Sequence, residues 1–291
     1  MKLYLFNPVQ FVLLLLVLSV TGQPAVSHAS EPAIGRVLLV KGVVTAFTEE
    51  GQLRTLDKGS EVFKKDTIET AGDSFIVMKM NDDTKLTMRP NSEMKLDEFD
   101  QTEGEEKAIF NLLKGGLRTV TGAIGSKKPE AFKVSTSVAT IGVRGTDYYT
   151  RICAKDCPPE ELSLSQFDRV PSAPVGGNGS TKQKKLYELD INNEIKGENA
   201  VDCKPVGEIE EALYTAVLDG KIYIRRGDKQ LDLEAIEAAF VNEKEIICLS
   251  EIPNFIMHDD YLSGNPEDDF TLYNFLEFIN DEQQRCEVPG A

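Results

Sequence analysis

The chain of 291 residues has no tryptophan and only two histidines, His28 and His258. Histidine is the side chain that most often serves as a general base or as a metal ligand. Because histidine is so scarce, His258 is the one histidine outside the N-terminal segment that could belong to a catalytic triad. No Gly-x-Ser-x-Gly sequence, which would supply the nucleophile of such a triad, is present. The sequence also lacks a phosphate loop, a dinucleotide fingerprint and a complete calcium loop. We therefore predict no catalytic residues, no enzymatic activity and no cofactor.

Positive charge is scarce as well, with 32 Lys and Arg against 48 Asp and Glu and a formal net charge of −16. Nucleic acids and anionic membrane surfaces are normally bound through clustered Lys and Arg. The basic clusters here are short and lie among Gly and Ser residues, at 127–128 and 182–185. This balance argues against nucleic acid and the membrane surface as partners.

Long apolar runs are limited to FVLLLLVLSV at 11–20, which is about half the roughly 20 residues that a membrane-spanning helix needs. Lys2 precedes this run and the small-residue stretch VSHA follows it at 26–29. This arrangement predicts a secretory signal peptide over residues 1–29, cleaved near Ala29, with an uncut anchor as the alternative. The mature chain is then expected to be exported and to have no transmembrane segment.

No cysteine precedes Cys153, which argues against a lipid anchor. The five cysteines lie in the part expected to reach an oxidising compartment, where disulfides are the default: Cys153, Cys157, Cys203, Cys248 and Cys286. The odd number leaves at least one unpaired, and the sequence does not select the pairing. We favour Cys248 with Cys286, and Cys203 with either Cys153 or Cys157. The Cys-x-x-x-Cys spacing lacks further ligands for zinc, so no metal site is predicted.

The pattern that is present is one of short apolar alternations broken by turn residues, from residue 34 to about residue 151. Side chains that alternate by two are typical of strands, so we predict an all-β domain over 30–156. One segment, AIFNLLKGGLRTV at 108–120, is interpreted as two strands around a glycine turn. The architecture expected is a β-sandwich or a solenoid-like stack of short strands.

Composition changes after this domain, and we divide the remainder into three segments. Residues 157–210 are rich in Gly and polar residues, so we expect a flexible polar insertion. Residues 211–245 return to strand patterns that resemble 40–56, which predicts a closing hairpin of the same domain. In the tail, 246–291, Asn265 and Pro266 begin a predicted short α-helix whose apolar side chains share one face: Leu272, Phe275, Leu276 and Ile279.

The segment SVATIGVRGTDYY at 137–149 places two glycines, Gly142 and Gly145, inside a sequence otherwise suited to a strand. Glycine within a strand often marks a bulge or the close approach of another backbone. The structural interpretation is a corner in which Arg144 caps carbonyl groups or pairs with Asp147 or Asp73. The alternative is that Arg144 faces a ligand, because a guanidinium suits a carboxylate or a phosphate. We favour the structural interpretation.

The ordered set GRVLLVKGVV, LDKGSEVFKKDTIETAGDSFIVMKMNDDTKLTMRPNSEMKL, LLKGGLRTVTG and FKVSTSVATIGVRGTDY closely resembles the FecR domain, an extracytoplasmic all-β module. The resemblance covers roughly residues 34–150, and 217–233 is similar to the closing strands of that domain. It implies structural roles for five glycines: Gly42, Gly59, Gly116, Gly142 and Gly145. As candidate ligand or partner residues we take Arg118, Arg144, Thr146 and Asp147. Ser137 stands where the family usually has proline.

In its best-known members the domain lies on a membrane-anchored chain and relays an iron-siderophore signal from an outer-membrane receptor to a sigma factor. This sequence shows neither a cytoplasmic segment nor an anchor, so the resemblance implies a free-standing module, most simply in the periplasm. We expect it to act in sensing or signal relay by binding a periplasmic or membrane protein, through exposed strand edges or the loops of the insertion. The alternatives are an envelope carbohydrate- or peptidoglycan-binding protein, using Tyr148, Tyr149, Tyr214 and Tyr223 as stacking surfaces, and a structural envelope protein.

Overall fold

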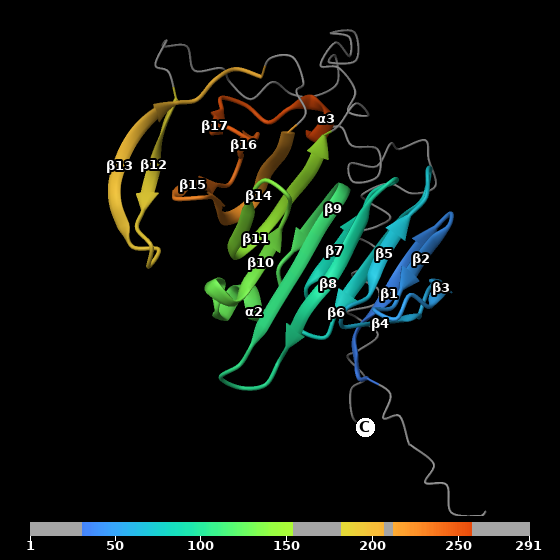
Figure 1. Ribbon diagram of the computed structural model, residues 1–291. Helices are drawn as coiled ribbons and strands as arrows, with labels where there is room; N and C mark the ends of the chain where they lie inside the picture. The colour runs from blue at the N-terminus through green and yellow to red at the C-terminus, as the bar shows by residue number, and fades with distance from the viewer. Residues whose placement is uncertain (1–30, 154–181, 207–211, 258–291) are drawn as a thin grey trace, which may run out of the picture. The chain divides into compact units, whose positions relative to one another are not determined.

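The computed structural model describes residues 31–153, 182–206 and 212–257 (Figure 1). Strands make up most of these residues, which confirms the all-β class. The predicted signal peptide, Cys157 and Cys286, and the predicted helix that begins at Asn265 lie outside the described residues. Within those ranges no helix is long and apolar enough to cross a membrane.

Within the described residues, seventeen strands form one sheet. In chain order the strands are β1 (Ala33–Lys41), β2 (Val44–Phe47), β3 (Leu53–Thr55), β4 (Glu61–Phe63), β5 (Thr67–Thr70), β6 (Phe75–Met80), β7 (Lys85–Met88), β8 (Glu93–Asp100), β9 (Lys107–Val120), β10 (Phe132–Ser135), β11 (Thr140–Cys153), β12 (Gln183–Leu189), β13 (Ile195–Asp202), β14 (Ala212–Arg226), β15 (Lys229–Glu234), β16 (Glu237–Val241) and β17 (Ile246–Leu249). The helical segments are α2 (Ala123–Lys127), the 3-10 turn η1 (Pro129–Ala131) and α3 (Asn254–Met257).

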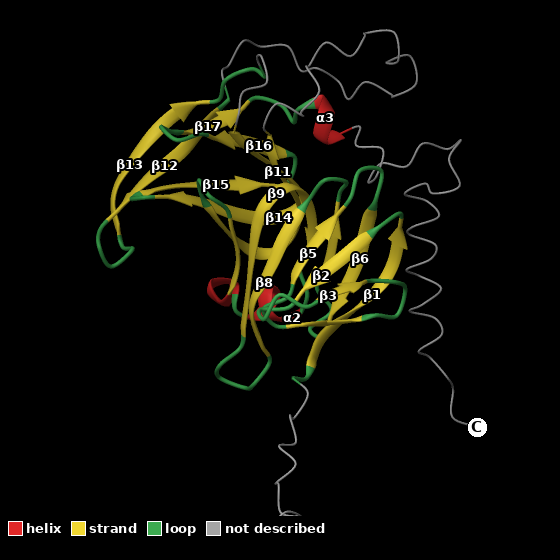
Figure 2. Ribbon diagram, turned by 45° about the vertical axis from the view of Figure 1, so that its right-hand side comes forward, coloured by secondary structure: helices red, strands yellow, loops and turns green. Residues whose placement is uncertain are grey.

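Three long strands, β9, β11 and β14, change partners midway and so turn the sheet back on itself (Figure 2). The first half of β9 pairs with β8, and its second half pairs with β7 and β11. Similarly, β14 pairs with β16 before Gly220 and with β15 after it. The predicted break at Gly115-Gly116 is therefore wrong: β9 continues through it as one bent strand, with Gly115 at φ 77°.

The main hydrophobic core lies on the inner face of this folded sheet, where alternate residues of nearly every strand meet. Phe110 and Phe132 pack edge to face there, with ring centroids 5.6 Å apart. Two smaller clusters lie on other surfaces. One is centred on Tyr149, Tyr214 and Phe255 of α3, and the other consists of Leu38, Phe75 and Val77.

Residues 183–202, which we expected within a flexible polar insertion, instead form the hairpin β12–β13. β12 also pairs with β15, so the hairpin continues the sheet. The physical reason is that QKKLYEL carries enough apolar alternation to contribute to the core: Leu189 is buried, and Leu186 and Val201 pack against the main cluster. Charged residues on both sides of these apolar positions made the strand pattern difficult to recognise in the sequence.

Candidate functional site

The GVRGT segment lies in β11 and forms a structural corner. Gly142 faces Tyr223 across the β11–β14 ladder, and the tyrosine ring occupies the space that a side chain at 142 would need. The ladder is then interrupted between Arg144 and Asp147, where Gly145 has a φ of 61°. Gly220 of β14, with φ 81°, lies against the Gly145 carbonyl so closely that a Cβ would overlap it. Close backbone approach explains the glycines.

Thr146 fixes this corner through its hydroxyl and its amide. Its amide donates to Thr121 Oγ1 (2.7 Å), and its hydroxyl donates to the Lys221 carbonyl oxygen (2.6 Å). The amide of Arg144 donates to the same hydroxyl oxygen (3.2 Å). Because Thr146 is buried and links β11 to β14 and to the segment before α2, its position indicates a structural role.

Arg118 of β9 and Asp147 of β11 form a bidentate ion pair. Nε donates to Oδ1 at 2.9 Å, and Nη2 donates to Oδ2 at 2.6 Å. The two side chains are only 12% and 21% exposed, and the guanidinium also lies 5.5 Å from the centre of the Tyr149 ring. Burial is the largest single influence and would lower the pKa of Arg118, but the hydrogen bonds and charge interactions with Asp147 and Tyr149 together outweigh it and raise the pKa. Two of the candidate ligand residues, Arg118 and Asp147, are therefore ion-pair partners of each other.

Arg144 differs from the other three candidates because its side chain is exposed. The expected ion pair with Asp147 is absent, since Asp147 binds Arg118, and among the described residues no carboxylate lies within ion-pair distance of Arg144. Its backbone contributes to the corner while its guanidinium faces solvent. Arg144 thus remains a candidate contact for a partner, whereas Arg118, Thr146 and Asp147 hold the fold together.

The remaining glycines of the motif occupy turns or close contacts. Gly42 and Gly59 lie in turns at φ 77° and 89°, and Gly116 lies beside the side chains of Arg89 and Arg151. Their positions agree with structural roles. Among the described residues no group of three or more His, Cys, Asp or Glu is placed to hold a metal ion.

The disulfide prediction needs a correction. Cys203 bonds to Cys248, so neither the favoured pairing of Cys248 with Cys286 nor that of Cys203 with Cys153 or Cys157 is right. The sequence did not indicate that the chain after β13 runs beside β17. There the Lys204 amide donates to the Cys248 carbonyl oxygen (2.9 Å) and the Ser250 amide donates to the Lys204 carbonyl oxygen (2.8 Å). Cys153 is also disulfide-bonded.

Strand β13 presents an unpaired edge that sequence analysis did not locate. Within the described residues it pairs with β12 alone, and most of its residues are exposed. The amide of Cys203 donates to the Lys182 carbonyl oxygen (2.7 Å), which makes these two residues a hydrogen-bonded pair of the antiparallel ladder. Because such pairs alternate, residues 197, 199 and 201 bond to β12, while Glu198, Ala200 and Asp202 direct their backbone groups outward.

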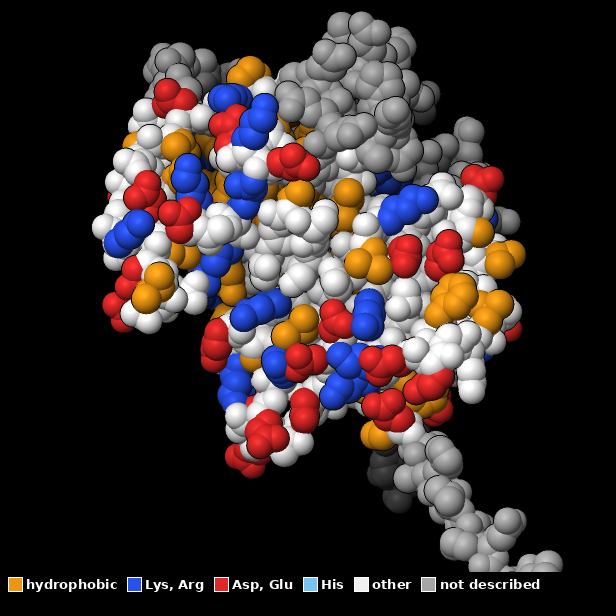
Figure 3. All heavy atoms as spheres, viewed as in Figure 1, with side chains coloured by type: hydrophobic (Ala, Val, Ile, Leu, Met, Phe, Trp, Pro, Cys, Tyr) orange, Lys and Arg blue, Asp and Glu red, His pale blue; other side chains and the backbone are white. Residues whose placement is uncertain are grey.

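Charged side chains of both signs surround this edge (Figure 3). Lys185 pairs with Glu198 (2.9 Å), and Lys196 lies 4.0 Å from Asp228. Charges on an edge strand normally discourage indiscriminate pairing with other sheets. The edge is therefore exposed to solvent and lined by charges that disfavour unspecific strand pairing.

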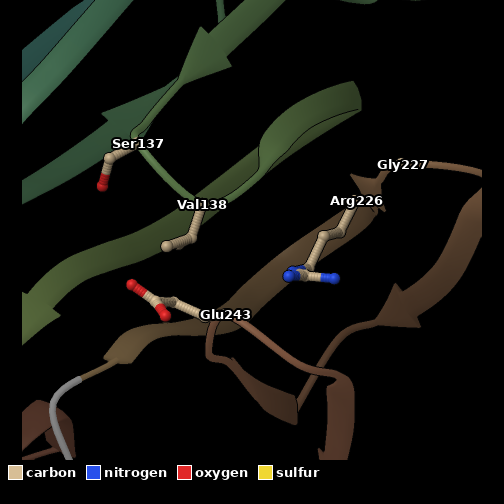
Figure 4. Close-up of a pocket in the computed structure, with 5 residues that line it drawn as sticks. All are labelled: Ser137, Val138, Arg226, Gly227 and Glu243. Atoms are coloured by element: carbon tan, nitrogen blue, oxygen red, sulfur yellow. The ribbon is translucent and has the colours of Figure 1, made fainter.

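A pocket of about 380 Å³ lies among three turns (Figure 4). Ser137 and Val138 come from the β10–β11 turn, Arg226 from the end of β14, Gly227 from the β14–β15 turn, and Glu243 from the β16–β17 turn. Arg226 also donates to the Lys244 carbonyl oxygen (3.4 Å). A guanidinium and a carboxylate facing one hollow could hold a small zwitterion, although Val138 is the only apolar lining residue.

One of the comparisons with known proteins identifies a family. The family model "FecR protein" matches residues 66–158. No curated protein matches the chain at a significant level. Among solved structures, two structures of a proposed anti-sigma factor from Parabacteroides distasonis align at 12% identity and TM-score 0.40. They cover 68% and 74% of this chain and 64% and 74% of the other.

A "cell surface anchoring domain" aligns at 29% identity and TM-score 0.21 over 21% of this chain and 82% of the other. The first anti-sigma factor structure is spanned over slightly less than two thirds of its length. These structural likenesses are too weak to carry an argument about function. The match of the family model, over the segment that contains the β11 corner, shows that the chain carries a FecR domain.

Proposed function

We propose that this protein is a non-catalytic exported module that acts in extracytoplasmic sensing or signal relay, most simply in the periplasm, by binding a protein partner. The FecR domain supports a role related to signalling. The single observation that supports the mode of binding is the free edge of β13, an eight-residue strand that is paired on one side among the described residues. A partner strand added there would satisfy the outward backbone groups of Glu198, Ala200 and Asp202.

Binding of envelope glycans has less support. Carbohydrate sites commonly present exposed aromatic rings, but Tyr148, Tyr149 and Tyr214 are buried. Tyr223 is half-buried and packs against Gly142 and beneath the Arg225 guanidinium, 5.1 Å from its ring centre. The four tyrosines expected to supply stacking surfaces therefore do not form an exposed groove.

The proposal is tested by photo-crosslinking in cells. A photoreactive amino acid replaces Ala200, whose backbone lies at the free edge, and cross-linked proteins are purified and identified by mass spectrometry. The same replacement at Leu53, an exposed residue of β3, serves as the control. We expect one envelope protein to be captured from position 200 and not from position 53. Capture of only glycan fragments, or equal capture at both positions, would overturn the proposal.

Two proline variants separate edge pairing from hairpin folding. Ala200→Pro removes an amide that does not bond to β12, and proline is tolerated on edge strands whose amide faces solvent. Asn199→Pro removes an amide that bonds to β12 and should disrupt the hairpin itself. With the photoreactive amino acid moved to Glu198, whose backbone also lies at the free edge, we expect Ala200→Pro to abolish capture of the partner while the melting temperature stays near that of the wild type. Undiminished capture by Ala200→Pro would show that the partner does not add a strand at β13.

A further inference from the structure

Two charged side chains of opposite sign line the pocket between the three turns without neutralising each other. Figure 4 shows the guanidinium of Arg226 and the carboxylate of Glu243 around the space that Ser137 and Val138 also line. Among the described residues neither charge forms an ion pair, and Arg226 makes one long hydrogen bond of 3.4 Å, to the Lys244 carbonyl oxygen. Most donors of the guanidinium and both oxygens of the carboxylate are therefore available to a ligand.

The topology of the sheet brings these residues together from three hairpins. β11 and β14 are antiparallel and Thr140 lies opposite Arg225, so the turn before β11 lies beside the end of β14. The hydrogen bond from Arg226 to the Lys244 carbonyl oxygen then joins the end of β14 to the β16–β17 turn. A ligand in this pocket would contact all three turns at once.

The walls of the pocket are held in place by hydrogen bonds within the turns. In the β10–β11 turn the Thr136 hydroxyl oxygen accepts the amides of Val138 (3.3 Å) and Ala139 (3.1 Å). In the β16–β17 turn Asn242 Oδ1 accepts two amides of its own turn, at 2.9 and 3.0 Å. Gly227 has a φ of 58° in the β14–β15 turn, and the space where its side chain would lie is open. Such preformed walls lower the entropic cost of binding a small molecule.

The chemistry of the lining selects a ligand that carries both charges. A simple anion would be attracted by Arg226 and repelled by Glu243, and a simple cation would meet the reverse. A carboxylate matches the planar fork of a guanidinium, and an ammonium group donates to a carboxylate. The volume of about 380 Å³ lies near the lower end of the roughly 300–1,000 Å³ typical of small-molecule sites. Since Val138 is the only apolar lining residue, the carbon skeleton of the ligand must be short.

We propose that this pocket binds a small zwitterion, a carboxylate and an ammonium group joined by a short aliphatic chain, as in an amino acid. The carboxylate binds Arg226, the ammonium group binds Glu243, and the Ser137 hydroxyl supplies a neutral donor and acceptor. The site does not depend on the addition of a partner strand at β13, so either proposal can fail while the other stands. In this assignment the protein binds a small molecule as well as a protein partner.

A titration followed by nuclear magnetic resonance tests the proposal on the purified protein. The ligands are glycine, β-alanine, 4-aminobutanoate and 5-aminopentanoate, which carry the same two charges at increasing separation. We expect at least one of them to give saturable shifts of the amide resonances of residues 137–138, 226–227 and 243. The carboxylate and the amine of the same chain length, each with a single charge, should bind at least roughly tenfold more weakly. If none of the four gives saturable shifts there, or if the singly charged compounds bind equally well, the proposal is wrong.

Two variants assign each charge of the protein to one end of the ligand. Glu243→Gln should abolish the preference for the zwitterion over the simple carboxylate, and Arg226→Gln should abolish its preference over the simple amine. Glu245→Gln and Lys244→Gln are the matched controls, because they remove exposed charges of the same turn that do not line the pocket, and they should change the affinity by less than about twofold. Unchanged resonances of β1 and β6 establish that each variant is folded. A Glu243→Gln protein that still prefers the zwitterion roughly tenfold would contradict the assignment.

Discussion

Arg118 and Asp147 join β9 to β11 through two parallel hydrogen bonds at 2.9 and 2.6 Å, next to the corner formed by Gly145. Asp147 had been a candidate partner of Arg144. The register of the sheet gives Asp147 a different partner. Asp147 lies opposite Val120 and next to the pair of Tyr148 and Thr119, so Arg118 is close enough to bind it. Arg144, the arginine between the two glycines of the motif, is therefore exposed, whereas Arg118 is the arginine that forms the ion pair.

The first prediction contrasts these two arginines. Asp147→Ala leaves the Arg118 guanidinium mostly buried without its carboxylate, which should cost about 2 kcal/mol of unfolding free energy. In a domain of this size such a loss lowers the melting temperature by about 4–8 °C. Arg144→Ala should change the unfolding free energy by less than about 0.5 kcal/mol, because its side chain is exposed. Thermal unfolding of both variants measures the difference, and a stability loss in Arg144→Ala comparable to that in Asp147→Ala would refute this assignment.

The second prediction concerns the two glycine contacts of the corner. A Cβ at Gly220 would overlap the Gly145 carbonyl, and the φ of 81° is unfavourable for any other residue, so Gly220→Ala should cost about 3 kcal/mol or more. A Cβ at Gly142 would overlap only the end of the half-exposed Tyr223 side chain, which can rotate away, so about 1 kcal/mol is expected. Urea unfolding of the two variants tests this order.

A double-mutant cycle provides the control for Gly142. If the ring of Tyr223 is the obstacle, Gly142→Ala should cost little in a Tyr223→Ala background. The same background should not rescue Gly220→Ala, because the obstacle there is backbone. Equal costs for Gly142→Ala with and without the tyrosine ring would mean that the glycine serves another purpose.

The third prediction concerns the Cys203–Cys248 disulfide, which fixes the chain after β13 to β17. The two cysteines are 45 residues apart, and loop-closure entropy for that separation corresponds to about 4 kcal/mol as an upper value. Replacing both with serine should lower the unfolding free energy by about 2–4 kcal/mol and weaken partner capture by β13. A non-reducing peptide map checks the pairing itself. A peptide that links Cys248 to Cys286 would contradict it.

Sequence reasoning identified the all-β class and the FecR resemblance because alternation and glycine turns are local signals. It failed where distant segments meet. Nothing local shows that Cys248 lies beside Cys203, or that Asp147 reaches Arg118 across a ladder. The hairpin β12–β13 was missed for another reason: polar and charged residues dominate both strands, and only Leu186, Leu189 and Val201 contribute to the core. Because strand β13 was not predicted from the sequence, its free edge was not predicted either.

The last prediction concerns pH and the attachment of the β12–β13 hairpin. Glu237 of β16 lies 2.8 Å from the ammonium group of Lys184 and 3.3 Å from that of Lys182, and it accepts the amide of Glu234. Burial would raise the pKa of Glu237, but the Glu234 amide and the two lysines outweigh burial and lower it from the ordinary 4.5. A carboxyl group whose pKa is lowered on folding stabilises the fold above its unfolded value, and this contribution is lost as the pH falls through the folded value.

The stability advantage of the wild type over Glu237→Gln should therefore be constant near pH 7 and shrink once the pH falls below about 4.5. Unfolding free energies of both proteins, measured by urea titration at a series of pH values, give this difference directly. Acidic groups elsewhere that do not interact with Glu237 titrate alike in both proteins and cancel. Hydrogen exchange of β12 should show the same trend, because Lys184 is the residue of that strand that Glu237 holds. An advantage that persists unchanged well below pH 4 would mean that Glu237 acts through packing, and that the hairpin is held by its ladder with β15 and the disulfide alone.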